Sequence, residues 1–210
     1  MTKAANKITN SKKTKWTVQK ALPYILIAGA VVGLVASMVL TLEHIALIKD
    51  PSHKLSCSLN PILNCGPIMT SEQATAFGFP NPLIGLVTFG AQALLGVSML
   101  AGARLKTWFW KLYSLSIVGG LIFTLWLMYE SIFKIQTLCI YCMSVWIVTF
   151  ITAWYLFQFM LAEKHIKLKN QKLTIFLRQH HGDIIISWFV VVILLVLHEF
   201  WYYYKQFFGF

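Results

Sequence analysis

The sequence predicts an all-α integral membrane protein with five transmembrane helices. Hydrophobic residues make up 58% of its 210 residues, charged residues make up 12%, and long apolar runs recur along the chain. Soluble domains are usually about 45–50% apolar and about 25% charged. A water-soluble fold of this composition would expose large apolar patches, and a disordered chain would be poor in hydrophobic residues. Lipid is therefore the expected solvent for most of the chain.

Five apolar stretches are long enough to cross a bilayer, which takes about 20 helical residues. We expect spans at residues 21–42, 82–101, 108–129, 138–162 and 184–203. The last span is interrupted near its end by two polar residues, which lie beside aromatic residues typical of a membrane interface. Strands of a membrane β-barrel would be about ten residues of alternating polarity, whereas these runs are continuous. The spans are therefore expected to be helices.

The basic residues predict the orientation. Segments 1–20, 102–111 and 163–183 hold 6, 3 and 5 Lys or Arg, which is 14 of the 18 in the chain. Because cytoplasmic loops carry the Lys/Arg excess, the N-terminus is expected in the cytoplasm and the C-terminus outside. We expect residues 1–20 to be a disordered basic cytoplasmic tail, 21–203 a single transmembrane domain, and 204–210 a short periplasmic end. This topology accounts for the net charge of +11 without a nucleic-acid partner.

The connections on the outer side differ in length. The outer loop, 45–81, contains four prolines and two glycines, which favour turns over a separate domain. The connection between the third and fourth spans, 130–137, is expected to be a short loop. Within the spans, Gly29 and Gly33 form a G-x-x-x-G pattern that predicts close helix packing. The Gly119–Gly120 pair is interpreted in the same way.

All four cysteines fall on the predicted outer side. Cys57 and Cys65 lie in the outer loop, where a structural disulfide is one interpretation. Cys139 and Cys142 open the fourth span with the C-x-x-C spacing of thiol oxidoreductases. The free N–H groups and the positive dipole end of a helix's first turn stabilise a thiolate. Helical spacing puts both sulfurs on one face, with Cys142 about one turn deeper in the membrane.

This arrangement predicts an electron relay. Soluble thioredoxin-fold proteins cannot enter lipid, and lipid quinones cannot leave it, so an outer and an inner dithiol would be needed to connect them. Thiol–disulfide exchange proceeds through mixed disulfides, for which a flexible loop supplies the movement. Structural zinc is the competing interpretation. However, zinc ribbons pair two tight C-x-x-C units about 15–20 residues apart, and these cysteine pairs lie more than seventy residues apart.

At these residues the sequence resembles the bacterial branch of the vitamin K epoxide reductase family. Three segments carry the resemblance: C-S-L-N-P-I-L-N-C-G at 57–66, F-G-F-P-N-P at 77–82 and L-C-I-Y-C at 138–142. A serine follows six residues after the second loop cysteine. The resemblance covers about residues 22–162, which include four spans and the outer loop.

The resemblance implies a membrane oxidoreductase in which four helices form a bundle around a quinone, either ubiquinone, menaquinone or a related naphthoquinone. By this similarity Cys142 reacts with the quinone, Cys139 exchanges with Cys65, and Cys57 takes electrons from a thioredoxin-fold protein. Electrons would pass from that partner to the quinone and so support disulfide-bond formation. The two protons for quinone reduction are expected from the outer aqueous phase.

The resemblance also implies residues at the quinone. Asn81 matches the family asparagine that hydrogen-bonds a quinone carbonyl, and Ser71 matches a hydroxyl of the loop helix. Trp146 stands where vertebrate relatives have a quinone-contacting tyrosine, so the choice of quinone does not transfer. From the residues alone, Asn81 before Pro82 is also an ordinary N-cap, as is Ser71. Met69 is expected in an apolar lid over the bundle, with quinone contact as a secondary role.

Many bacterial relatives carry a fused thioredoxin-like domain after the fifth span, whereas this chain ends at Phe210. The resemblance therefore implies a separate periplasmic DsbA-like partner, a site in the bacterial inner membrane, and cysteines that face the periplasm. Two alternatives remain. A DsbB-type oxidase would carry its C-x-x-C in the first outer loop, which is the opposite order. A non-enzymatic membrane scaffold would use the cysteines only as structural disulfides.

Overall fold

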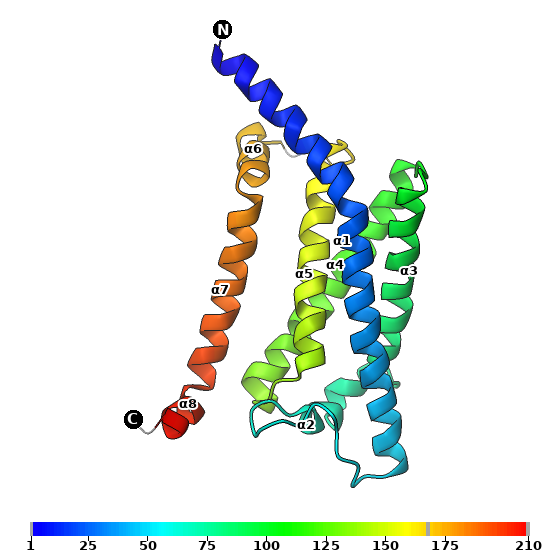
Figure 1. Ribbon diagram of the computed structural model, residues 1–210, viewed down its shortest axis with the longest axis vertical. Coiled ribbons are helices and arrows are strands. Elements are labelled where there is room, and N and C mark those ends of the chain that lie inside the picture. The colour runs from blue at the N-terminus through cyan, green and yellow to red at the C-terminus, as the bar shows by residue number, and fades with distance from the viewer. Residues whose placement is uncertain (1, 167–168, 209–210) are drawn as a thin grey trace.

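The computed structural model describes residues 2–166 and 169–208, and it is an all-α membrane protein (Figure 1). Its described part contains no β-strand beyond one isolated bridge. Among the described residues, five helical segments are long and apolar enough to cross a membrane, and they follow the five predicted spans: Val18–Lys49, Pro82–Leu100, Thr107–Ile135, Ile140–Ala162 and His181–Glu199. The chain is thus a multi-pass membrane protein.

The first helix is longer than its span. Helix α1 runs from Thr2 to Lys49 and includes most of segment 1–20, so the expectation of a disordered tail was wrong for the described backbone. No glycine or proline precedes Pro23. Alanine, lysine and glutamine are good helix formers, so the chain has no local reason to leave the helix before its span.

Four helices form the bundle: α1, α3 (Pro82–Leu100), α4 (Thr107–Tyr129) and α5 (Ile140–Ala162). Helix α1 packs on α3 and on α5, and α4 packs on α5. Helices α3 and α4, which form the fourth side of the bundle, do not pack extensively on each other. This asymmetry leaves room for a cavity beside these two helices.

Glycines explain how closely α1 approaches its neighbours. A Cβ atom on Gly33 would lie 2.5 Å from the ring of Phe89, and one on Gly29 would lie 3.1 Å from a side-chain nitrogen of α3. The predicted close packing at these two positions is confirmed. At Gly119 and Gly120 a Cβ atom would meet nothing within 4 Å. The same interpretation was wrong there, because these two glycines border open space.

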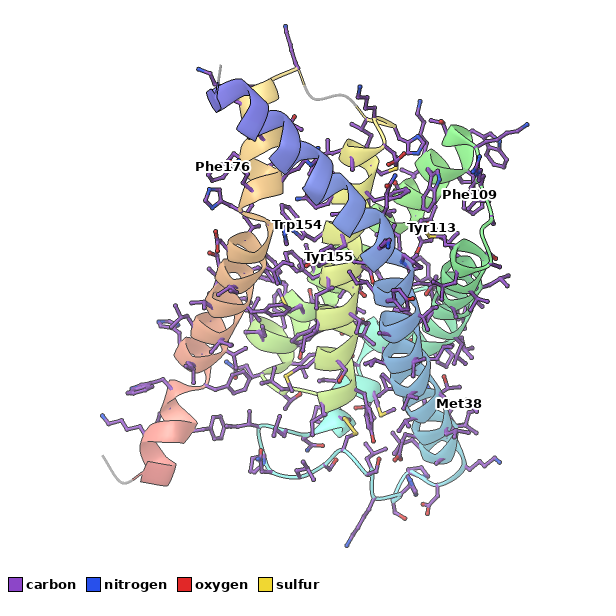
Figure 2. All side chains as sticks on the ribbon, turned by 45° about the horizontal axis from the view of Figure 1, so that its top comes forward. Met38, Phe109, Tyr113, Trp154, Tyr155 and Phe176 are labelled. Carbon is purple, nitrogen blue, oxygen red and sulfur yellow. A yellow bond between two sulfur atoms is a disulfide. The ribbon has the colours of Figure 1, made fainter. Side chains whose placement is uncertain are left out.

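The fifth span stands beside the bundle (Figure 1). Helix α7 (His181–Glu199) follows the short α6 (Gln171–Gln179) and has no buried residue. Near its start, the indole of Trp154 on α5 (labelled in Figure 2) donates a hydrogen bond to the His181 carbonyl at 3.1 Å. At its far end Phe200 is 1% exposed and packs in one cluster with Ile132 and Leu138. Helix α8 (Trp201–Phe208) follows.

Different connecting segments lie at the two ends of the molecule. The N-terminus, the α3–α4 connection and α6 lie at one end, and the cysteine-bearing loop and α8 lie at the other (Figure 1). The loop forms two short helices, α2 (Cys65–Met69) and the 3-10 helix η1 (Glu72–Thr75). The predicted short loop at 130–137 is largely a π-helix, η2 (Glu130–Ile135), which prolongs α4 until Gln136 adopts a left-handed conformation with φ 55°.

Candidate functional site

The outer loop is fastened to the bundle by polar contacts around Glu43 of α1. One Glu43 carboxylate oxygen accepts the Ser56 amide N–H at 3.1 Å, and the other lies 3.0 Å from the His53 ring nitrogen. These contacts hold the chain immediately before Cys57. Cys57 itself is only 2% exposed.

A second attachment brings the two cysteine pairs together. Leu63 and Leu138 form an isolated parallel bridge, in which the Leu138 amide donates to the Ile62 carbonyl at 2.8 Å and the Asn64 amide donates to the Leu138 carbonyl at 3.0 Å. In a parallel pairing both chains advance in the same direction. Cys65 follows one segment and Cys139 follows the other, so the bridge sets these two residues side by side.

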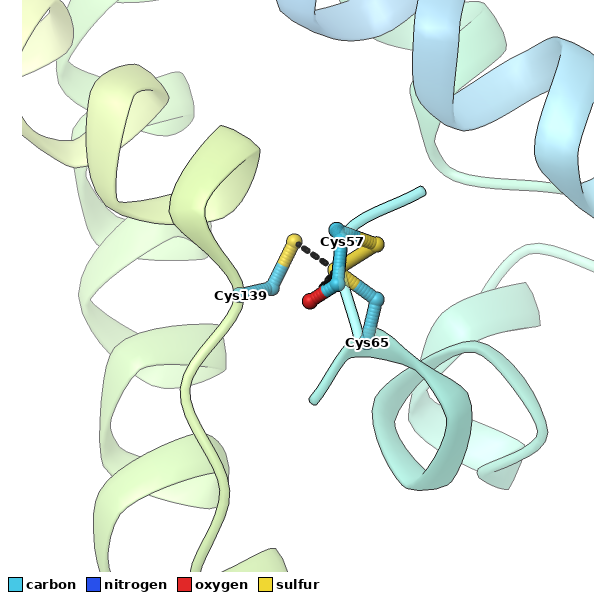
Figure 3. A group of neighbouring side chains, drawn as sticks. All are labelled: Cys57, Cys65 and Cys139. Carbon is cyan, nitrogen blue, oxygen red and sulfur yellow. Dashed lines mark hydrogen bonds between the residues drawn. A yellow bond between two sulfur atoms is a disulfide. The ribbon is translucent and has the colours of Figure 1, made fainter. Parts of the chain in front are cut away.

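The sulfur atoms of the two cysteine pairs lie close together, as this parallel pairing leads one to expect (Figure 3). Cys57 and Cys65 form a disulfide, whereas Cys139 and Cys142 are free thiols. The Sγ atom of Cys139 lies 2.9 Å from the Sγ atom of Cys65. Thiol–disulfide exchange requires attack of one sulfur on another. The arrangement is therefore suited to exchange between the inner dithiol and the loop disulfide.

Cys139 occupies the N-cap of α5, as the predicted position of the C-x-x-C motif requires. Its sulfur accepts a hydrogen bond from the Cys142 backbone N–H at 3.4 Å. A hydrogen bond from the Cys142 side chain, together with backbone N–H groups of the first turn, lowers the pKa of Cys139 against the opposing effect of burial. The lowered pKa favours the thiolate form of Cys139, the member of the pair that contacts Cys65.

Cys142 points to a different neighbour. It lines a cavity of about 350 Å³ enclosed by α1, α3, α4 and α5 and covered at one end by the loop. Ligand pockets commonly have volumes of about 300–1,000 Å³. The cavity wall is mainly apolar and includes Phe89, Val87 and Gly120. The inner dithiol therefore lies between the loop disulfide on one side and an apolar cavity on the other.

Three polar residues are connected by hydrogen bonds at the loop end of the cavity. The Asn81 side-chain amide donates to the Gln73 backbone carbonyl at 2.6 Å, and the Gln73 side-chain amide donates to Glu130 Oε2 at 3.3 Å. The Asn81 side chain does not cap α3, so the N-cap interpretation was wrong for its side chain. Its Oδ1 atom is buried without a hydrogen-bond partner. All three residues line the cavity.

The remaining predicted site residues also line the cavity. Ser71 stands at the N-cap position of η1, but its hydroxyl donates to the Ile68 carbonyl at 2.7 Å instead of capping the helix. Met69 is buried in the same cluster as the loop disulfide and Cys139. Trp146 contributes to the wall from α5. The structure therefore brings together the eight residues singled out from the sequence, around one cavity and one sulfur cluster.

Metal binding fits this cluster poorly. Cys57, Cys65 and Cys139 have ligand atoms within 4.8 Å of one another. Zinc requires thiolate ligands, and the disulfide removes two of these three thiols. The cluster has the chemistry of thiol exchange.

Sequence reasoning missed two of the polar cavity residues, Gln73 and Glu130. Glu130 was assigned to a short loop, and Gln73 carried no motif. The position of Glu130 could have indicated its role, because it lies at the end of a span and nine residues before the C-x-x-C motif. Ionisable residues at membrane depth are usually functional.

Comparison with known families agrees with this geometry. A sequence model of the Vitamin K epoxide reductase family matches residues 24–157. The match covers the second and third spans, most of the first and fourth, the outer loop and both cysteine pairs, and it falls within the segment that carried the resemblance. The chain therefore belongs to the vitamin K epoxide reductase family, a family of membrane oxidoreductases.

Proposed function

We propose that the protein is a thiol:quinone oxidoreductase that reoxidises a DsbA-like thioredoxin-fold protein and passes the electrons to a membrane quinone. The observation that carries this proposal is the position of the inner dithiol. Cys139 contacts Cys65 of the loop disulfide, while Cys142 lines the apolar cavity. A dithiol in this position can exchange with a water-facing loop on one side and reduce a lipid-soluble acceptor on the other.

The electrons pass in three exchanges. The two thiols of the partner become a disulfide while the Cys57–Cys65 disulfide is reduced. The Cys65 thiolate then attacks Cys139 of an oxidised Cys139–Cys142 pair, and the loop disulfide forms again as the inner pair is reduced. Finally the inner dithiol gives two electrons and the quinone becomes a hydroquinone. The observed state, with an oxidised loop and reduced inner thiols, corresponds to the point before the last exchange.

The cavity has the features of a quinone site. Its wall is apolar, its loop end carries the Asn81 amide, and its side between α3 and α4 lacks extensive helix contact. Val87 lines the cavity and is also 73% exposed at the molecular surface. A quinone head beside Cys142 and Asn81 would let an isoprenoid tail leave through this side into lipid. Ubiquinone, menaquinone and related naphthoquinones all have such a quinone head with an isoprenoid tail.

The partner must reach a sulfur that is buried in the observed state. Since Cys57 is 2% exposed, attack by a thioredoxin-fold protein requires the loop to open. The contacts of Glu43 with His53 and Ser56 are the attachments that would release. We further propose that the chain lies in a bacterial inner membrane, with the N-terminus in the cytoplasm and the cysteines facing the periplasm. The basic segments at the opposite end of the molecule support this orientation.

The proposal is tested with purified protein, a reduced DsbA-like protein and a quinone, by following quinone absorbance. Wild-type protein is expected to turn over, and Cys→Ala changes at each of the four cysteines should stop turnover. The Cys57→Ala and Cys65→Ala proteins should still reduce quinone once after chemical reduction, whereas Cys142→Ala should not. If Cys142→Ala retained turnover, a scaffold with structural disulfides would explain the cysteines better.

A further inference from the structure

Quinone reduction needs two protons as well as two electrons, and one thiol of the inner pair faces the cavity. Cys142 lines the cavity, whereas Cys139 is fully buried against Cys65 and is not among the lining residues. The Cys142 thiol can therefore deliver its proton directly into the cavity, and the Cys139 thiol is not placed to do so. The second proton must come from another group at the cavity. The need for this second donor rests on the proposed function, because it arises only if the acceptor in the cavity is a quinone.

Glu130 is the carboxylic acid that lines the cavity. It is the first residue of the π-helical turn η2, at the loop end of the molecule, and its side chain is partly buried. Its Oε2 atom accepts the Gln73 side-chain N–H at 3.3 Å. The backbone carbonyl of Gln73 in turn accepts the Asn81 side-chain N–H at 2.6 Å. Gln73 therefore connects the carboxyl group to the Asn81 amide, which also lines the cavity.

The Asn81 amide provides a second observation at the same place. Its nitrogen is held by Gln73, and its Oδ1 atom is buried without a hydrogen-bond partner. Buried polar atoms are nearly always hydrogen-bonded, so an unpaired one in a cavity wall needs an explanation. An acceptor of this kind matches a hydroxyl group, which a hydroquinone has and a quinone lacks.

We propose that Glu130 donates one of the two protons that convert the bound quinone to hydroquinone, and that Asn81 Oδ1 accepts a hydrogen bond from a hydroxyl formed in the reaction. The Cys139 thiolate and the Cys142 thiol each lose one electron and join in a disulfide. The quinone gains these two electrons, one proton from the Cys142 thiol and one from the Glu130 carboxylic acid. Glu130 is left as a carboxylate and regains a proton from the aqueous phase at the loop end.

Other titratable groups surround this position within the described residues. His44, Tyr113 and Cys142 also line the cavity. Lys134 shares the π-helical turn, and His198 and Glu199 end α7, which packs on that turn. Among them Glu130 is distinguished by its connection through Gln73 to Asn81. A histidine donor at His44 is the rival explanation, and the experiment separates the two.

The test uses single-turnover reduction of a quinone by protein whose inner thiols have been chemically reduced. General acid catalysis contributes about 10²–10⁴-fold, so Glu130→Gln is expected to slow the quinone step about 100-fold. Glutamine keeps the size of the side chain and an oxygen for the Gln73 contact. Glu130→Gln should also change the pH profile of the quinone step. Glu130→Asp should restore part of the rate together with the wild-type pH dependence.

The matched control is Glu72→Gln, which removes the same charge from an exposed residue next to Gln73 that does not line the cavity. Its rate should equal the wild-type rate. Thiol–disulfide exchange between the loop and the inner pair should be unchanged in Glu130→Gln, which also shows that the variant is folded. A Glu130→Gln rate within twofold of wild type, or a slower rate with the wild-type pH profile, would overturn the inference. So would loss of the pH dependence in His44→Gln alone. Failure of wild-type protein to reduce any quinone would instead reject the proposed function.

Discussion

Replacing Cys57 and Cys142 together with alanine leaves Cys65 and Cys139 as the two thiols of the chain, and we expect them to form a disulfide under oxidising conditions. Their sulfur atoms lie 2.9 Å apart, and the Leu63–Leu138 bridge holds the two segments in register. In the wild-type chain the same exchange would be transient, because Cys57 or Cys142 resolves it. The double variant removes both resolving thiols.

The expected stabilisation follows from the length of chain that each disulfide closes. The Cys57–Cys65 disulfide spans 8 residues, whereas Cys65 and Cys139 are separated by 74. Loop-closure entropy gives at most about 2.5 kcal/mol for the first and about 4.5 kcal/mol for the second. The difference of about 2 kcal/mol corresponds to a rise in Tm of about 4–8 °C for a chain of this size.

The assay compares thermal unfolding in detergent with and without reductant, for wild-type protein and for the double variant. Peptide mapping by mass spectrometry then identifies the disulfide. The loss of Tm on reduction should be larger in the double variant than in wild type. If the double variant stayed as two free thiols under an oxidant that oxidises the wild-type loop, the contact between Cys65 and Cys139 would not describe the protein in solution.

Two further predictions concern the inner thiol and the helix packing. The pKa of Cys139 is lowered by its hydrogen bond from Cys142, so Cys142→Ala should raise this pKa. In protein that lacks the loop cysteines, a pH titration of thiolate absorbance should then show its midpoint at a higher pH. Because the folded-state pKa lies below the unfolded one, the Cys139 thiolate stabilises the fold above the unfolded pKa, and this stabilisation is lost as pH falls through the folded pKa. Gly33→Ala should lower the free energy of unfolding by about 1–3 kcal/mol, since its Cβ would overlap the Phe89 ring. Gly120→Ala, with open space around it, should leave that free energy unchanged or raise it, and equal losses at both glycines would contradict this packing.

The spans and the position of the C-x-x-C motif could be predicted from the sequence because both are local properties. Twenty apolar residues specify a membrane helix wherever they occur, and a C-x-x-C motif at the start of a span fixes its position on the first turn. The pairing of Cys65 with Cys139 came from the family resemblance. The physical cause of this pairing is the parallel bridge between Leu63 and Leu138. This bridge joins distant segments, and no local sequence pattern predicts it.

The errors have similar causes. Gly119–Gly120 resembles a packing motif, but whether a glycine faces a neighbouring helix or a cavity depends on the rotation of α4. Asn81 stands at the N-cap position of α3 with Pro82 next to it, as the pattern predicts, but its side chain makes no capping hydrogen bond and its amide N–H donates to the Gln73 carbonyl. Glu130 was not predicted to line the cavity, because the sequence predicts a loop where α4 continues as a π-helix.

The most direct test of the relay isolates its last exchange. Protein with Cys57→Ala and Cys65→Ala is reduced chemically, freed of reductant and mixed with one equivalent of quinone without any partner protein. We predict one equivalent of hydroquinone together with a Cys139–Cys142 disulfide, and no further turnover when a reduced thioredoxin-fold protein is added. If no hydroquinone formed, or if the partner sustained turnover without the loop cysteines, electrons would not travel from the loop through the inner pair to the cavity.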